Sequence, residues 1–216
     1  MNNILRVTLI IISSVLLVFF CYKLYLNLTL IEKPGFYDFE RSNIQEKIVG
    51  DKKILTEKNL GVKMEIPKDW EYEKSEQTII FGTPGLDIKD ILKNFNEWKQ
   101  GCLVGFSVSN DYVQKFENGE VLSTYDDESN RIKYFKEGDE DYCDFDYCEV
   151  INMNGIEGLE QTREFSHGTL EGGKYKYITL LDDKNRRFYT IDTYLSEQIP
   201  ECQEHLNNFV NSLEFK

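Results

Sequence analysis

Carboxylates are concentrated in one segment of the sequence. Residues 126–149 contain ten acidic and three basic residues. The spacing of Asp139, Asp141, Asp144 and Asp146 loosely matches that of calcium ligands, and Ca²⁺ prefers about six to eight hard oxygen ligands. The segment lacks the glycine and the twelfth-position glutamate of an EF-hand loop. We therefore favour a solvated surface loop here and keep a Ca²⁺ site as the alternative.

Apart from Cys21, the chain has four cysteines, an even number that is consistent with two disulfide bonds in an oxidising compartment. Cys143 and Cys148 enclose four residues instead of the two of a redox-active pair, and their acidic neighbours discourage thiolate chemistry. Zinc would need two close pairs, whereas Cys102 and Cys202 stand singly. We predict the pairs Cys143–Cys148 and Cys102–Cys202, with a free core thiol at Cys202 as the alternative.

Two histidines limit acid–base catalysis. Ser166 and His167 are neighbours in the chain, and adjacent side chains diverge too far to form a nucleophile–base pair. The sequence contains no nucleophile elbow, zinc-protease motif or phosphate-binding loop. We expect a protein that is not an enzyme and needs no cofactor, with Ca²⁺ as the alternative. A hydrolase that uses His167 is the alternative.

Aromatic residues are frequent in the second half of the chain. Tyr175, Tyr177 and Tyr189 fall in one expected hairpin, where they would form an exposed ligand-binding face or, alternatively, cross-strand pairs in the core. The formal net charge of −13 speaks against a nucleic-acid partner or an anionic lipid surface.

Residues 7–25 are predominantly apolar and carry one charge, Lys23. As a helix they would extend about 28 Å, which matches the hydrocarbon core of a bilayer. The chain contains no alanine and shows no small residues at a cleavage position, and Phe20 before Cys21 does not fit a lipobox. We predict a retained transmembrane anchor that contacts the lipid bilayer.

The positive charges on the two flanks of this span are nearly balanced, so the orientation is inferred from the four cysteines. We expect the C-terminal domain outside the cytoplasm, in a single-pass protein of the cell membrane. The expected organisation is an anchor at 1–31, a stalk or linker at 32–59 with a short helix around 38–48, and a folded domain at 60–216.

Hydrophobic periodicity in the domain alternates between strands and helices. Strands are predicted at 60–66, 77–81 and 102–108, and two hairpins at 149–153 with 156–165 and at 174–181 with 187–195. Helices are predicted at 87–98 and 199–213 from apolar positions three and four residues apart. The pattern indicates an α+β domain with helices packed on an antiparallel sheet.

Three stretches together resemble the bacterial relatives of the PsbP and Mog1 group: residues 61–70 (GVKMEIPKDW), 154–158 (NGIEG) and 209–215 (FVNSLEF). The resemblance covers residues 60–216 and implies an α/β/α sandwich with a central antiparallel sheet. The acidic segment and the four cysteines depart from the group.

Members of that group are small accessory or binding modules, often exported and anchored, without a recognised catalytic apparatus. The resemblance therefore implies a non-catalytic binding or accessory module of the cell envelope with an envelope protein as its partner. A Ca²⁺-binding adhesion or sensor module using 139–146 and an envelope hydrolase are the alternatives.

Overall fold

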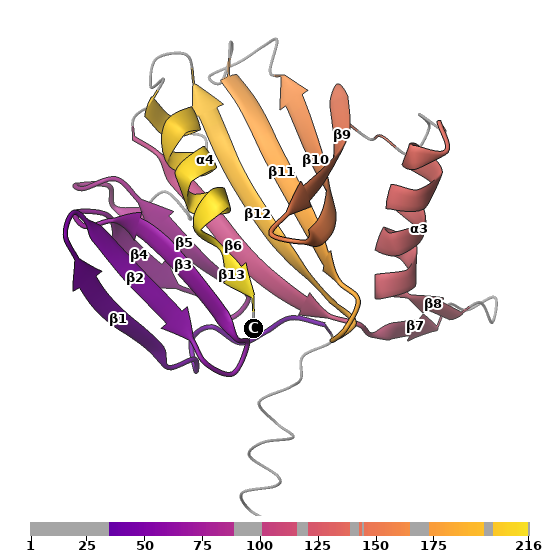
Figure 1. Cartoon of the computed structure of the whole chain (residues 1–216), viewed down its shortest axis with the longest axis horizontal. Coiled ribbons are helices and arrows are strands. Elements are labelled where there is room, and N and C mark those ends of the chain that lie inside the picture. The colour runs from indigo at the N-terminus through magenta and orange to yellow at the C-terminus, as the bar shows by residue number, and fades with distance from the viewer. Residues whose placement is uncertain are drawn as a thin grey trace, which may run out of the picture. The chain divides into compact units, whose positions relative to one another are not determined.

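The computed structural model describes residues 35–88, 101–115, 121–138, 143, 145–164, 173–196 and 201–215. The chain divides into two compact units, Met1–Pro34 and Gly35–Lys216, and all of the described residues belong to the second (Figure 1). The predicted anchor at 7–25 lies outside the described residues. In the part that is described, no helix has the length and apolar character needed to cross a membrane.

A seven-stranded antiparallel sheet forms the centre of the domain. Its strands, in spatial order, are β4 (Glu71–Lys74), β5 (Thr78–Gly82), β6 (Leu103–Asn110), β12 (Arg187–Ser196), β11 (Gly173–Asp182), β10 (Ile156–Glu164) and β9 (Tyr147–Met153). The two predicted hairpins are the pairs β9–β10 and β11–β12, which confirms them. Asn154 and Gly155 both have positive φ, as the tight turn between β9 and β10 requires.

A second antiparallel sheet contains β1 (Ile44–Val49), β2 (Lys52–Glu57), β3 (Val62–Pro67) and β13 (Glu214–Phe215). The prediction of a stalk at 32–59 with a helix around 38–48 was therefore wrong, because this segment supplies two strands of the domain. Strand β1 lies at the edge of its sheet and is exposed at five of its six residues. An edge strand of this kind lacks the alternation that identifies a half-buried strand.

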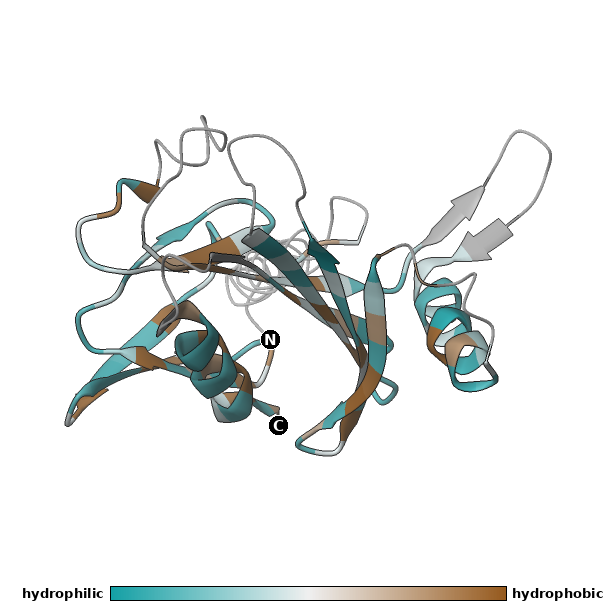
Figure 2. Ribbon diagram, turned by 90° about the horizontal axis from the view of Figure 1, so that it is seen from above, coloured by the Kyte–Doolittle hydropathy of each residue, from teal (hydrophilic) through white to brown (hydrophobic). Residues whose placement is uncertain are grey.

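Helix α4 (Glu201–Ser212) packs in the core between the two sheets. Figures 1 and 2 show α4 and the second sheet on the same side of the seven-stranded sheet. The ring of Phe209 lies 5.2 Å from that of Phe81 and 6.3 Å from that of Phe106, while Leu55 and Met64 reach the same core from the second sheet. This part of the structure confirms the predicted closing helix and the α+β class.

Helix α3 (Thr124–Lys136) forms where a surface loop was predicted. Ser123 caps it by accepting a hydrogen bond from the backbone of Asp126, and acids stand in its first turn and lysines in its last, as the helix dipole favours. Only Tyr125 and Ile132 are buried, and they pack against β10 and β11. Such a narrow apolar face gives little periodic signal, so the sequence pattern missed the helix.

The side chain of Arg186, in the turn between β11 and β12, fixes the start of α3. Its guanidinium donates to Asp111 and Asp126, each over 2.9 Å. Burial by itself would raise the pKa of Asp111, but hydrogen bonds from Ser123, Arg186 and the backbone of Tyr125 outweigh it and hold the pKa below its ordinary value. A short antiparallel pair, β7 (Val113–Lys115) and β8 (Val121–Ser123), leads into the helix.

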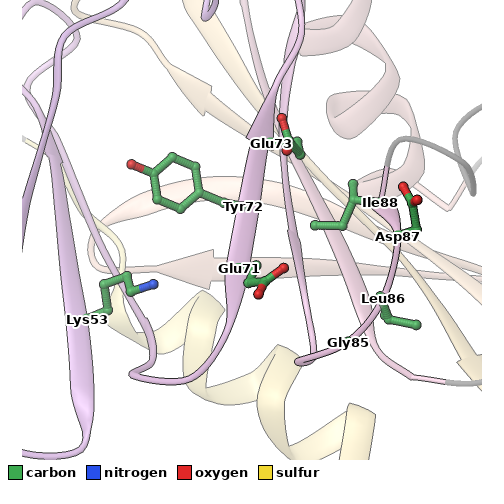
Figure 3. A pocket seen from close by; sticks show the side chains of 8 residues that line it. All are labelled: Lys53, Glu71, Tyr72, Glu73, Gly85, Leu86, Asp87 and Ile88. Atoms are coloured by element: carbon green, nitrogen blue, oxygen red, sulfur yellow. The ribbon is translucent and has the colours of Figure 1, made fainter.

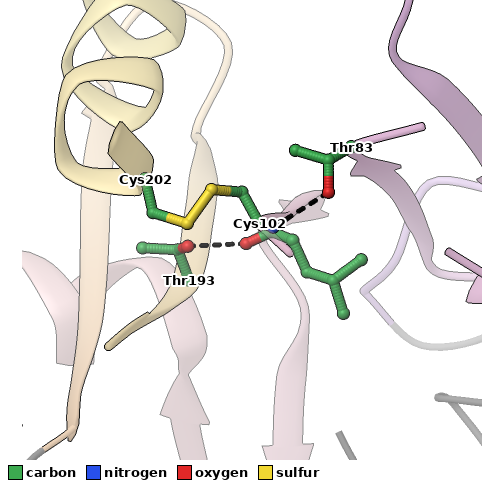
Figure 4. Close-up of a disulfide and its surroundings, with 5 residues drawn as sticks. Thr83, Cys102, Thr193 and Cys202 are labelled. Atoms are coloured by element: carbon green, nitrogen blue, oxygen red, sulfur yellow. Dashed lines mark hydrogen bonds between the residues drawn. A yellow bond between two sulfur atoms is a disulfide. The ribbon is translucent and has the colours of Figure 1, made fainter. Parts of the chain in front are cut away.

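The structure contains both predicted disulfides, Cys102–Cys202 and Cys143–Cys148. Figure 4 shows the first of them joining α4 to the residue that precedes β6. Its surroundings are held by two further bonds: the backbone of Cys102 donates to Thr83, and the Thr193 hydroxyl donates to the Leu103 carbonyl over 2.6 Å. This disulfide spans 100 residues of the chain, whereas the other spans five.

Loop length gives a prediction for the two disulfides. Replacing Cys102 and Cys202 together by serine is expected to lower the free energy of unfolding by about 4.7 kcal/mol, because the longer loop restricts the unfolded chain more strongly. The pair Cys143→Ser and Cys148→Ser is expected to lose about 2 kcal/mol. Denaturant unfolding of the full chain measures both, and equal losses would contradict the loop-length account.

Candidate functional site

A pocket of about 630 Å³ opens beside strand β4 (Figure 3). It is bordered by strands of both sheets and by the loop that follows β5. The lining residues are Lys53 of β2, Glu71, Tyr72 and Glu73 of β4, and Gly85, Leu86, Asp87 and Ile88 of the loop.

Strand alternation decides which side chains of β4 face which way. Tyr72 pairs with Phe81 of β5 and packs against the core, with the two rings 6.3 Å apart. Glu71 and Glu73, one residue to either side, therefore point away from the core. On that side Ile88 lies over Gly82, where a β-carbon would come within 3.3 Å of its side chain. The absence of a side chain at Gly82 lets the loop approach the sheet and form one wall of the pocket.

The pocket is acidic. In Figure 3 the carboxylates of Glu71, Glu73 and Asp87 lie around the space between β4 and the loop. The one basic residue of the lining, Lys53, donates from Nζ to the Trp70 carbonyl over 2.7 Å and lies 4.0 Å from the Glu46 carboxylate. Its charge is thus partly engaged inside the protein, so the pocket favours a positively charged ligand.

Tyrosines 175 and 177 lie on the face of the seven-stranded sheet that points away from α4. Their rings are 6.4 Å apart, and the ring of Phe145 lies 6.5 and 6.2 Å from them in nearly parallel planes. Both tyrosines are partly exposed. They are the part of the predicted ligand face that the structure brings together.

Tyr189 lies elsewhere, in the core. It is 1% exposed, its ring stacks 6.1 Å from that of Phe106, and it lies 4.5 Å from the tilted ring of Phe215. The register of β11 and β12 places Tyr189 opposite Leu180 and so on the core face, whereas Tyr177 is opposite Asp192 on the other face. Tyr189 therefore does not join Tyr175 and Tyr177 on one surface, because its parity in the strand is the opposite one.

Of the predicted Ca²⁺ ligands, only Asp146 is among the described residues, and its carboxylate accepts a hydrogen bond from the backbone of Glu164 over 2.7 Å. Asp139, Asp141 and Asp144 lie outside the described residues, as does His167. Within the described ranges, no three His, Cys, Asp or Glu side chains are grouped so that they could hold a metal ion. The Ca²⁺ site stays a prediction.

One further group, which the sequence patterns did not single out, is the carboxyl of Asp192. It lies over Gly105 of the neighbouring strand, where a β-carbon would be 2.5 Å from Asp192 Oδ1. Burial raises the pKa of Asp192, and no described residue makes a hydrogen bond or an ion pair with it. The sequence did contain a signal for this buried carboxyl. Asp192 is a lone acid in a strand of mostly apolar residues and threonines, and the adjacent strand has a glycine opposite it.

Burial raises the pKa of Asp192 in the folded state above its value in the unfolded chain. At a pH between these two values, the folded chain therefore binds more protons than the unfolded chain. The free energy of unfolding consequently falls as the pH rises through this window. Asp192→Asn is therefore expected to be more stable than the native chain at pH 7, with a difference that shrinks toward pH 4. Thermal unfolding across this range measures it. Exposed Glu204, changed to Gln, is the control, and a pH-independent difference for Asp192→Asn would contradict the account.

No protein-family model matches the sequence, and no curated protein matches it. Solved structures do resemble the fold. The structure is similar to that of cyanobacterial PsbP from Synechocystis sp. PCC 6803, with a TM-score of 0.45 and 11% identity over 81% of this chain and 94% of that one. It is also similar to a crystal structure from Bacteroides thetaiotaomicron VPI-5482, with a TM-score of 0.40 and 13% identity over 72% of this chain. The chain spans 45% of the length of that protein.

Proposed function

We propose that this chain is a non-catalytic binding or accessory module of the cell envelope. Residues 7–25 anchor it in the cell membrane, and the domain from residue 35 onward lies on the outer side. Two disulfides support this location, since disulfides persist in oxidising compartments. The apolar run at 7–25 supports the anchor.

The observation that carries the binding role is the acidic pocket beside β4. Its volume of about 630 Å³ falls within the usual range of ligand sites. Among the described residues that line it, none is a serine, cysteine or histidine, so the lining supports recognition better than nucleophilic catalysis. Its carboxylates are complementary to lysine and arginine side chains.

The strand that borders the pocket indicates how such a partner is held. In the described part of the sheet, β4 is an edge strand that pairs only with β5. An edge strand offers unpaired backbone groups to an added strand, and pockets beside it select the side chains of that strand. We infer that the partner is an envelope protein that contributes an extended basic segment, with its basic side chains near Glu71 and Asp87.

Crosslinking in the native host tests this proposal. A photoreactive residue at position 71 of the full chain is expected to form an adduct with one envelope protein, whereas the same residue at position 204, exposed on α4, is not. Charge reversal by Asp87→Lys should reduce the adduct about tenfold, or about 1.4 kcal/mol, because it replaces an attraction for the basic segment by a repulsion.

Glu204→Lys is the matched charge reversal and should leave the adduct at position 71 unchanged. Equal adducts from positions 71 and 204, or an adduct that persists in Asp87→Lys, would refute the pocket as the binding site.

A further inference from the structure

We propose that the face of the seven-stranded sheet opposite α4 holds a second site, which binds a primary ammonium group between the carboxylate of Asp192 and the rings of Tyr175 and Tyr177. The site lies on β11 and β12, whereas the pocket described above is built from β2, β4 and the loop after β5. The two sites share no residue, and this inference does not depend on the proposed role of the pocket.

The register of four strands places the polar groups of this site in one row. Gln161 of β10 is opposite Tyr177 of β11, which is opposite Asp192 of β12, which is opposite Gly105 of β6. Directly opposed residues have side chains on the same face of a sheet, about 5 Å apart. The row therefore brings an amide, a phenol and a carboxyl together although they are distant in sequence.

The carboxyl of Asp192 is the anionic half of the site. Gly105 leaves room for it, since any larger residue would put a β-carbon 2.5 Å from Oδ1. Among the described residues, none donates a hydrogen bond to it or forms an ion pair with it. A partly buried carboxylate without a partner is costly, so a cation that pairs with it gains more than at an exposed acid.

The tyrosines supply the aromatic half. The faces of aromatic rings attract cations, most strongly where water is partly excluded, and Tyr175 and Tyr177 are each partly buried. The register of β11 against β12 makes Tyr175 a diagonal neighbour of Asp192 on the same face. Burial first, and then the nearby charge of Asp192, raise the pKa of the Tyr175 hydroxyl. The same cluster already contacts one cation, since the Arg163 guanidinium lies 4.8 Å from the centre of the Phe145 ring.

One buried polar atom on this face points to the ligand's donors. Gln161 is 1% exposed, yet its Oε1 has no hydrogen-bond partner among the described residues. Native proteins rarely leave such atoms unsatisfied. A primary ammonium carries three N–H donors, whereas a quaternary ammonium carries none, and the unsatisfied acceptor therefore favours the primary form.

Binding of matched probes to the full chain in non-ionic detergent tests the site. The probes are N-acetyl-lysine amide, phosphoethanolamine and the neutral N-acetyl-norleucine amide, measured by calorimetric titration. At least one ammonium probe is expected to bind and the norleucine probe is not. Stronger binding of the lysine probe indicates a protein side chain as the natural ligand, and stronger binding of phosphoethanolamine indicates a lipid headgroup.

Asp192→Asn preserves the shape of the side chain and is expected to weaken binding at least tenfold, while Tyr175→Leu weakens it several-fold. Glu204→Gln should bind like the native chain. The proposal is overturned if neither ammonium probe binds at millimolar concentration, if the norleucine probe binds equally well, or if folded Asp192→Asn retains native affinity.

Discussion

The packing of α4 between the two sheets is the interaction on which the rest of the structure depends. Phe209 contacts Phe81 and Phe106 of the seven-stranded sheet, and the same buried cluster includes Leu55 and Met64 of the second sheet. Without the helix, both sheets would expose an apolar face to water. The disulfide between Cys202 and Cys102 joins α4 to the start of β6, and so ties this packing together covalently.

Because the core lies on one face of the seven-stranded sheet, the other face is left for different chemistry. Strands β11 and β12 each contribute to both: Ile178 and Ile191 point into the core, while Tyr177 and Asp192 point away from it. Helix α3 covers part of that second face through Tyr125 and Ile132. The strand period of two therefore builds a core and a polar aromatic surface from the same residues of sequence.

Elements with a strong local pattern could be predicted from the sequence. The hairpins were marked by alternation around turn residues, and α4 by apolar positions on one helical face. Elements with a weak local pattern could not. Strand β1 is exposed at most positions, and α3 buries only two residues, so neither shows the period that identifies its class.

The site residues divide in the same way. Tyr175 and Tyr177 have the same parity on one strand and were correctly grouped, whereas placing Tyr189 needed the register of β11 against β12. The role of Asp192 depends on Gly105 in a strand that is distant in sequence, and no local pattern carries that information. Long-range register is thus the part of this structure that sequence periodicity does not contain.

The most direct test of the account is thiol labelling of the full chain in intact cells of its native host. Lys184, exposed in the turn between β11 and β12, is replaced by cysteine and treated with a membrane-impermeant maleimide. The account predicts that this cysteine is labelled in intact cells, and that Cys102, Cys143, Cys148 and Cys202 react only after denaturation with a reductant. Labelling of position 184 only after lysis, together with four native thiols that react in denaturant without a reductant, would place the domain inside the cell and contradict the account.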